Sequence, residues 1–139
     1  MTAVLTDVEA RVLDAVDEAA AVDLLHRTIA VPSIGGTDAE CDVQHLVADE
    51  LAALGCDVDQ WRIDLAAAAT GPDAPGQEVE RTEAWGVVGT AGAAESGVPA
   101  LVLAGHSDVV PAGDRALWPG DPFVPRMDGG AVHGAAPAT

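Results

Sequence analysis

The stretch LVLAGHSDVVP at residues 101–111 is the most informative part of the chain. Residues Leu101–Ala104 form an apolar run of strand length, and His106 and Asp108 follow where the strand should give way to a loop. Open α/β sheets carry their chemistry at this edge. Imidazole is the commonest metal-ligating side chain, and a nearby carboxylate holds the ring in one tautomer and raises its basicity. We therefore predict a strand at Pro99–Ala104, with His106 as a metal ligand and Asp108 as the carboxylate that orients it.

A His-x-Asp pair alone is a weak signal, because most short polar pairs at strand ends are ordinary surface groups. The surrounding sequence strengthens it. The relevant segments are Leu24-Leu25, residues 29–33 (IAVPS), 35–37 (GGT), 104–111 (AGHSDVVP), Leu117-Trp118, Asp121-Pro122-Phe123, Pro125 and 128–134 (DGGAVHG). Together, over about Ala21 to Gly134, these segments resemble the M20 family of zinc metallopeptidases, most nearly the branch of acetylornithine deacetylase and succinyl-diaminopimelate desuccinylase.

The resemblance implies an α/β fold in which residues 1–134 are the N-terminal portion of an α/β/α catalytic domain with a mixed, mostly parallel sheet, truncated here. It implies a metal-dependent hydrolase of amide bonds in N-acyl amino acids or small peptides, with zinc as cofactor and two zinc ions per site. His106 would be the histidine ligand of one zinc, and Asp108 the catalytic-site carboxylate that fixes its imidazole. The intact family forms a homodimer through a domain that we expect to lie beyond Thr139.

The end of the chain departs from the family pattern. The family continues with Gly-Arg-Gly-Ala-x-Asp-Met-Lys, whose aspartate bridges both metal ions, whereas Gly134 is followed here by AAPAT at residues 135–139. If that family element is written in GC-rich codons and one C is deleted at the first codon boundary, the reading frame shifts. The shifted frame encodes Gly-Ala-Ala-Pro-Ala-Thr followed by a stop codon, which is the sequence of residues 134–139. We therefore expect residues 135–139 to be an aberrant, out-of-frame tail and the chain alone to be inactive, with one recognisable zinc ligand. Unrelated DNA after the codon for Thr139 would contradict this.

Composition narrows the classes of partner. The chain has 23 acidic residues against six arginines and no lysine, for a net charge of −17. Such a charge repels phosphate groups, so we expect no binding to nucleic acid or to an anionic membrane surface. No signal peptide is evident, and no apolar run approaches the roughly 20 residues that cross a bilayer, so we expect a cytoplasmic protein.

Two functions from different classes fit these observations. The first is the zinc amidohydrolase lineage, acting on a small-molecule substrate. The second is a small noncatalytic α/β module that binds a metal or a partner through an exposed sheet edge. A monodisperse chain that melts cooperatively would favour the second.

Hydrophobic periodicity predicts the helices. Residues 7–30 fit one helix, or two with a bend near Asp17. A second helical segment runs from Thr37 to Leu54, with Thr37 and Glu40 as a capping box and Gly55 as a left-handed stop.

Alternating apolar and polar residues, bounded by turn residues, predict strands at 56–63, 85–90 and 99–104. The same signals predict a hairpin at 124–132 that turns at Asp128-Gly129. Residues 64–83 are expected to be a loop, and residues 91–98 a turn.

The remaining candidate side chains have ordinary structural interpretations. We expect Cys41 and Cys56 to be free thiols, His26 and His45 to have surface or capping roles, His133 to be a strand side chain, and Trp61, Trp85, Trp118 and Phe123 to serve packing.

Overall fold

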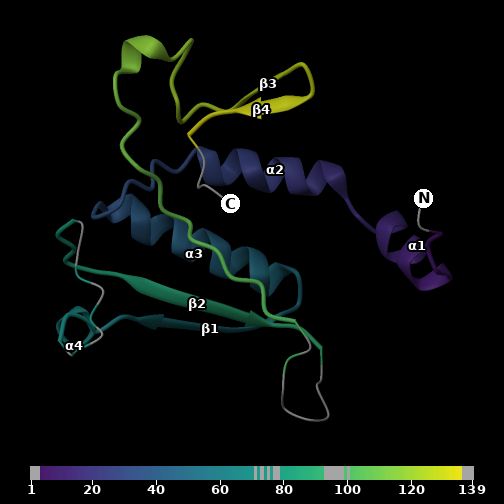
Figure 1. The fold of residues 1–139 in the computed structure, drawn as a ribbon, viewed down its shortest axis with the longest axis horizontal. Coiled ribbons are helices and arrows are strands. Elements are labelled where there is room, and N and C mark those ends of the chain that lie inside the picture. Colours follow the sequence, from purple (N-terminus) through teal and green to yellow (C-terminus); the bar gives the residue numbers. More distant parts are fainter. Residues whose placement is uncertain are drawn as a thin grey trace.

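The computed structural model describes residues 4–70, 72, 74, 76, 79–92, 99 and 101–135. It is a mixed α/β structure, which confirms the predicted class at this level (Figure 1). The elements in chain order are α1 (Asp7–Asp14), α2 (Glu18–Ile29), α3 (Asp38–Ala53), β1 (Asp57–Arg62), α4 (Leu65–Ala68), β2 (Trp85–Thr90), the 3₁₀ turn η1 (Arg115–Leu117), β3 (Arg126–Asp128) and β4 (Ala131–His133). No helix in the described ranges is both long and apolar enough to cross a membrane.

The N-terminal helical region is two helices, separated near the predicted bend. Helix α1 begins with a capping box, in which Thr6 and Glu9 satisfy each other's backbone amides. Helix α2 begins after Asp17, whose carboxylate accepts a hydrogen bond from the Ala20 amide at 2.9 Å. Asp17 thus caps α2, because its carboxylate satisfies an amide in the first turn that has no partner within the helix.

Helix α3 lies along the antiparallel pair β1–β2, and Gly55 ends it with φ of +82°, as predicted. The predicted capping box at its start is wrong. The Thr37 hydroxyl donates backwards to the Ile34 carbonyl at 2.7 Å, and the Glu40 carboxylate accepts from the Gly36 amide at 2.6 Å. The loop before the helix therefore takes both side chains that the box would have used.

Strands β1 and β2 pair over their whole length, from Asp57 opposite Thr90 to Arg62 opposite Trp85. Two glycines of β2 are explained by close packing. A Cβ at Gly86 would overlap the Trp61 ring, and one at Gly89 would lie 3.0 Å from Leu51 of α3. The glycines of β2 thus allow the close packing of β1, β2 and α3, and the bulky neighbours determine their positions.

Two turn regions differ in detail from the predictions. In the β3–β4 hairpin the turn is centred one residue later than expected, on Gly129 and Gly130, because both have positive φ (+56° and +82°). The predicted loop at 64–83 contains the short helix α4, which Asp64 caps through the Ala67 amide at 2.9 Å. The predicted turn at 91–98 lies largely outside the described residues.

The predicted strand at 99–104 and the mostly parallel sheet are not found. Both sheets in the described part of the chain are antiparallel pairs, and parallel pairing is limited to one bridge between Ile34 and Val109. The side chains of Leu101, Val102 and Leu103 are 72–87% exposed. A strand forms only where a neighbour supplies backbone partners, and none of the described segments does so here.

The core is small. Among the described side chains the buried hydrophobic ones are Ile29, Val43, Ala48 and Val109, and Ser33 is buried with them. Val109 belongs to the segment that follows Asp108, so the core holds one end of the His-x-Asp stretch in place.

Candidate metal centre

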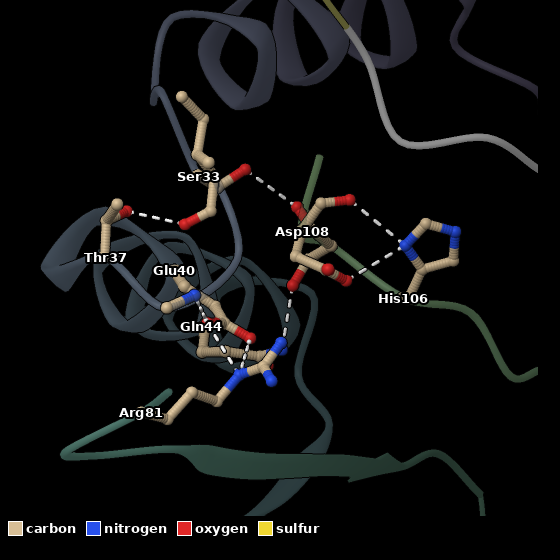
Figure 2. A network of polar contacts seen from close by, with 10 residues as sticks. Ser33, Thr37, Glu40, Gln44, Arg81, His106 and Asp108 are labelled. Carbon is tan, nitrogen blue, oxygen red and sulfur yellow. Dashed lines mark hydrogen bonds and ion pairs between the residues drawn. The ribbon is translucent and has the colours of Figure 1, made fainter. Parts of the chain in front are cut away.

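His106 and Asp108 meet as the sequence predicts. The imidazole Nδ1 lies 3.1 Å from the Asp108 carboxylate and 3.1 Å from the Asp108 main-chain oxygen (Figure 2). The second ring nitrogen points away from Asp108 in the same view. A carboxylate at Nδ1 favours the proton there, which leaves the lone pair of Nε2 for a ligand. Both side chains are accessible, with exposed fractions of 55% for His106 and 38% for Asp108.

Ser107, between the two, is fixed by side chains from two distant segments. The Ser33 hydroxyl donates to the Ser107 carbonyl at 2.9 Å, and the Gln44 amide of α3 donates to the Ser107 hydroxyl at 2.8 Å. Ser33 is 1% exposed, so its hydrogen bond is sheltered from water. Helix α3 and the loop before it therefore orient the peptide that carries His106 and Asp108.

The backbone continues this attachment beyond Asp108. The Val109 amide donates to the Ser33 carbonyl at 2.9 Å, and the Gly35 amide donates to the Val109 carbonyl at 3.3 Å. These two bonds form the parallel bridge, and Val109 is 7% exposed beneath it. The site rests on this bridge and on the Ser107 contacts, instead of on the strand end that the sequence predicted.

An ion pair braces the loop from the other side. Arg81 Nε lies 2.9 Å from both carboxylate oxygens of Glu40, and the two side chains are 22% and 15% exposed. Gly35 fits between Arg81 and Asp108, because a Cβ there would lie 3.3 Å from the guanidinium and 3.5 Å from the carboxylate. Gly36 has φ of +83°, and a Cβ on it would lie 2.7 Å from the Glu80 carbonyl. Two adjacent glycines thus allow the loop to approach the candidate site.

Comparison with known proteins finds relatives of similar sequence. The chain is 35% identical over 119 residues to a succinyl-diaminopimelate desuccinylase of Stenotrophomonas maltophilia (strain R551-3), covering 86% of this chain and 26% of the relative. It is 35% identical over 113 residues to the desuccinylase of Rhizorhabdus wittichii, covering 81% of this chain and 25% of the relative. It is 34% identical over 115 residues to that of Bordetella avium, covering 83% of this chain and 24% of the relative. This chain is homologous to the desuccinylases of the M20 family. It spans about a quarter of the length of these relatives. No protein-family model and no solved structure matches it significantly.

The resemblance to the M20 metallopeptidases implies a zinc site at these side chains. One imidazole with an orienting carboxylate suits a zinc ligand. A catalytic zinc takes about three protein ligands, and no group of three histidine, cysteine, aspartate or glutamate side chains in the described ranges lies close enough to hold a metal. The described residues therefore supply one imidazole suited to binding a metal and do not by themselves form a zinc site.

The other histidines have different surroundings. His45 is exposed, in agreement with the expected surface role, and it joins α3 to the sheet. Its Nδ1 lies 2.8 Å from the Gln60 amide, and its ring packs edge-on against Trp85 at 5.0 Å. His26 Nε2 is buried with no hydrogen-bond partner among the described groups, which differs from a surface or capping role. His133 lies on β4, as predicted.

Sequence reasoning missed the residues that hold the His-x-Asp peptide. Ser33 and the glycines at 35 and 36 lie in segments that carried the resemblance, so a signal existed for them. Gln44 and Arg81 had none, because each acts across more than 25 residues of sequence through a contact that only the fold creates.

Replacing Ser33 with alanine should loosen the site. The Ser107 carbonyl would lose its buried donor, and a polar group left unsatisfied costs about 1–3 kcal/mol. We expect faster hydrogen exchange at the Val109 amide, measured by NMR or mass spectrometry. Thr28→Ala is the matched control, because the Thr28 hydroxyl also donates to a carbonyl, that of Leu25, but is exposed. Equal effects of the two substitutions would contradict the role given to Ser33.

Both cysteines are free, as predicted, and half-buried. Burial raises the pKa of the Cys41 thiol, and the negative charges of Glu83 and Glu40 raise it further. Because the thiolate is the reactive form, we expect Cys41 to be alkylated slowly by iodoacetamide at pH 8 and faster as the pH rises. The measurement uses a Cys56→Ser variant with peptide mass mapping, and the same protein in urea gives the reference rate. Equal rates in the folded and unfolded states would contradict the prediction.

Proposed function

We propose that His106 and Asp108 belong to the metal site of an M20-type hydrolase, in which His106 binds zinc through Nε2 and Asp108 positions the ring. The substrate we propose is succinyl-diaminopimelate or a related N-acyl amino acid, whose amide bond is hydrolysed. The observation that carries this proposal is the 3.1 Å contact between His106 Nδ1 and the Asp108 carboxylate in a chain 34–35% identical to desuccinylases.

Each residue has a defined part in this proposal. Asp108 keeps the proton of the imidazole on Nδ1 and adds electron density to the ring, which strengthens Nε2 as a ligand. Ser33 and Gln44 keep the intervening peptide in place, so the ring does not have to be ordered when the metal binds. A zinc ion held by His106 and further ligands would supply Lewis-acid chemistry, activating water and the substrate carbonyl.

The 139-residue chain alone is expected to lack this activity. One imidazole holds zinc weakly, because tight sites combine several ligands of fixed geometry. We propose that the remaining ligands, the general base and a dimer-forming domain belong to the part of the M20 protein that corresponds to the other three quarters of the relatives.

A chimera tests the proposal. Residues 21–134 of this chain would replace the matched segment of the Stenotrophomonas maltophilia desuccinylase, and release of succinate from succinyl-diaminopimelate would be followed with and without zinc. We expect zinc-dependent hydrolysis by the chimera and none above a metal blank by the isolated chain. A folded, zinc-loaded chimera that does not hydrolyse succinyl-diaminopimelate would contradict the proposed function. Hydrolysis by the isolated chain would contradict the expectation that this chain needs the rest of the enzyme for activity.

A further inference from the structure

Helix α1 carries an apolar face that nothing in the described part of the chain covers. We define the α1 face as Val8, Val12 and Leu13, whose side chains are 58%, 62% and 57% exposed. Among the described residues, no hydrogen bond or ion pair joins α1 to another element. Figure 1 shows α1, in purple, at one end of the molecule, beyond α2 and apart from the sheet. Large apolar side chains gathered on one exposed face, unlike scattered ones, mark an interaction surface.

The sequence specifies α1 locally, but the helix is too short to be stable by itself. The capping box of Thr6 and Glu9 starts it, and the carboxylates of Asp7 and Glu9 favour its first turn. It spans eight residues, whereas isolated helices shorter than about 12–15 residues are marginal in water. Most helices in proteins gain their stability by packing an apolar face against another structure. The α1 face therefore needs an occupant.

The charges around the α1 face discriminate between the possible occupants. Residues 4–20 contain one cation, Arg11, and five carboxylates: Asp7, Glu9, Asp14, Asp17 and Glu18. A second copy of α1 would bring two acidic segments together, and an anionic membrane would repel them in the same way. Helices that lie on membranes carry lysine and arginine on their polar face, which is the opposite of this pattern. A partner with cations beside its apolar side would instead complement these carboxylates.

We propose that the α1 face docks an amphipathic helix of a partner protein, whose apolar side is bordered by lysine or arginine. Burial of Val8, Val12 and Leu13 supplies the affinity, as in other complexes of amphipathic helices. The carboxylates around the face select a basic partner and steer its approach. This interaction lies outside the His106–Asp108 pair and does not depend on the proposed hydrolase activity.

A designed peptide tests the docking. The full 139-residue chain would be titrated, at physiological salt, with a dye-labelled peptide of leucine and lysine whose leucines all lie on one helical face. The comparison peptide has the same composition in scrambled order, so it keeps the charge and loses the apolar face. We expect saturable 1:1 binding by fluorescence anisotropy, about 10-fold or more tighter for the amphipathic peptide because apolar burial adds to charge attraction. Hydrogen exchange at the α1 amides should become slower in the complex.

Matched variants separate the apolar contact from the charge. Val12→Ser should weaken binding about 10-fold, because a buried valine contributes roughly that factor and serine has a similar helix propensity. Asp14→Lys should weaken binding about 3- to 10-fold, although a lysine in the last turn favours the helix itself. Leu117→Ser, at an 83% exposed position of η1, and Asp59→Lys, on the exposed side of β1, are the controls and should leave binding unchanged.

Each outcome decides the proposal. Equal binding of the two peptides, or equal effects of Asp14→Lys and Asp59→Lys, would reveal general charge attraction and overturn it. Protection of the α1 amides in a dimer of the chain, or by phosphatidylcholine vesicles without peptide, would also overturn it and assign the face to a second copy or a membrane. Circular dichroism of each purified variant checks that the fold is retained. The test uses neither zinc nor succinyl-diaminopimelate, so a failure of the proposed hydrolysis would leave its result unchanged.

Discussion

Replacing His106 with alanine should abolish zinc-dependent hydrolysis in the chimera that carries residues 21–134. The substitution removes the proposed ligand atom, Nε2, while leaving the anchoring contacts of Ser107 and Val109 in place. Loss of a group that merely orients a ligand costs about 10- to 100-fold in metal affinity or activity. Loss of the ligand itself should cost more, so we expect a fall of over 100-fold in kcat/KM together with weaker zinc binding.

Asp108→Asn provides the graded comparison. The amide retains the shape of the carboxylate but loses its charge, so zinc affinity should fall by about 10- to 100-fold, less than for His106→Ala. His133→Ala is the matched histidine control and should retain activity, because His133 lies on β4 outside the His-x-Asp peptide. If His106→Ala retained zinc binding and activity, His106 would not be a ligand.

Replacing Val43 with aspartate should prevent the chain from folding. Val43 lies on α3, which packs against β1 and β2, and is 1% exposed. A buried charge without a partner costs about 3–5 kcal/mol, against a total stability of about 5–15 kcal/mol for an ordinary domain. The core here is small, so this loss is a large part of what stabilises it. We expect loss of cooperative urea unfolding and of slowly exchanging amides in β2.

Two control substitutions separate charge from packing. Val43→Ala removes two buried carbons and should cost about 1.5 kcal/mol. Val8→Asp introduces the same charge at a position that is 58% exposed in the first turn of α1, where a carboxylate is favourable, and should leave stability unchanged. Cooperative unfolding of the Val43→Asp variant at the urea midpoint of the original chain would show that α3 does not hold the core.

Much of the secondary structure could be predicted from local sequence. The bounds of β2, the break near Asp17 and the left-handed stop at Gly55 all agree with the structure. These features depend on side-chain caps and glycines that affect only the backbone a few residues away in sequence. The pairing of His106 with Asp108 is of the same kind, because a spacing of two lets one side chain reach the other directly.

The failures share a different cause. The capping box at Thr37 and Glu40 was wrong because the loop at Gly36 and the guanidinium of Arg81 compete for the Glu40 carboxylate. The strand at 99–104 was wrong because pairing depends on a neighbouring strand, which local apolar sequence does not supply. In both cases contacts outside the helix or strand itself decide the outcome.

By itself, then, the sequence determined helices α1, α2 and α3, the β3–β4 hairpin and the adjacency of an imidazole and a carboxylate. The tertiary structure alone decided what holds that pair in place, namely Ser33 and Gln44 on Ser107 and the bridge at Val109. It also decided that Leu101–Leu103 remain exposed and unpaired. The physical reason is that a helix satisfies its backbone hydrogen bonds within one segment, whereas a strand and a buried polar contact require partners brought from elsewhere by the fold.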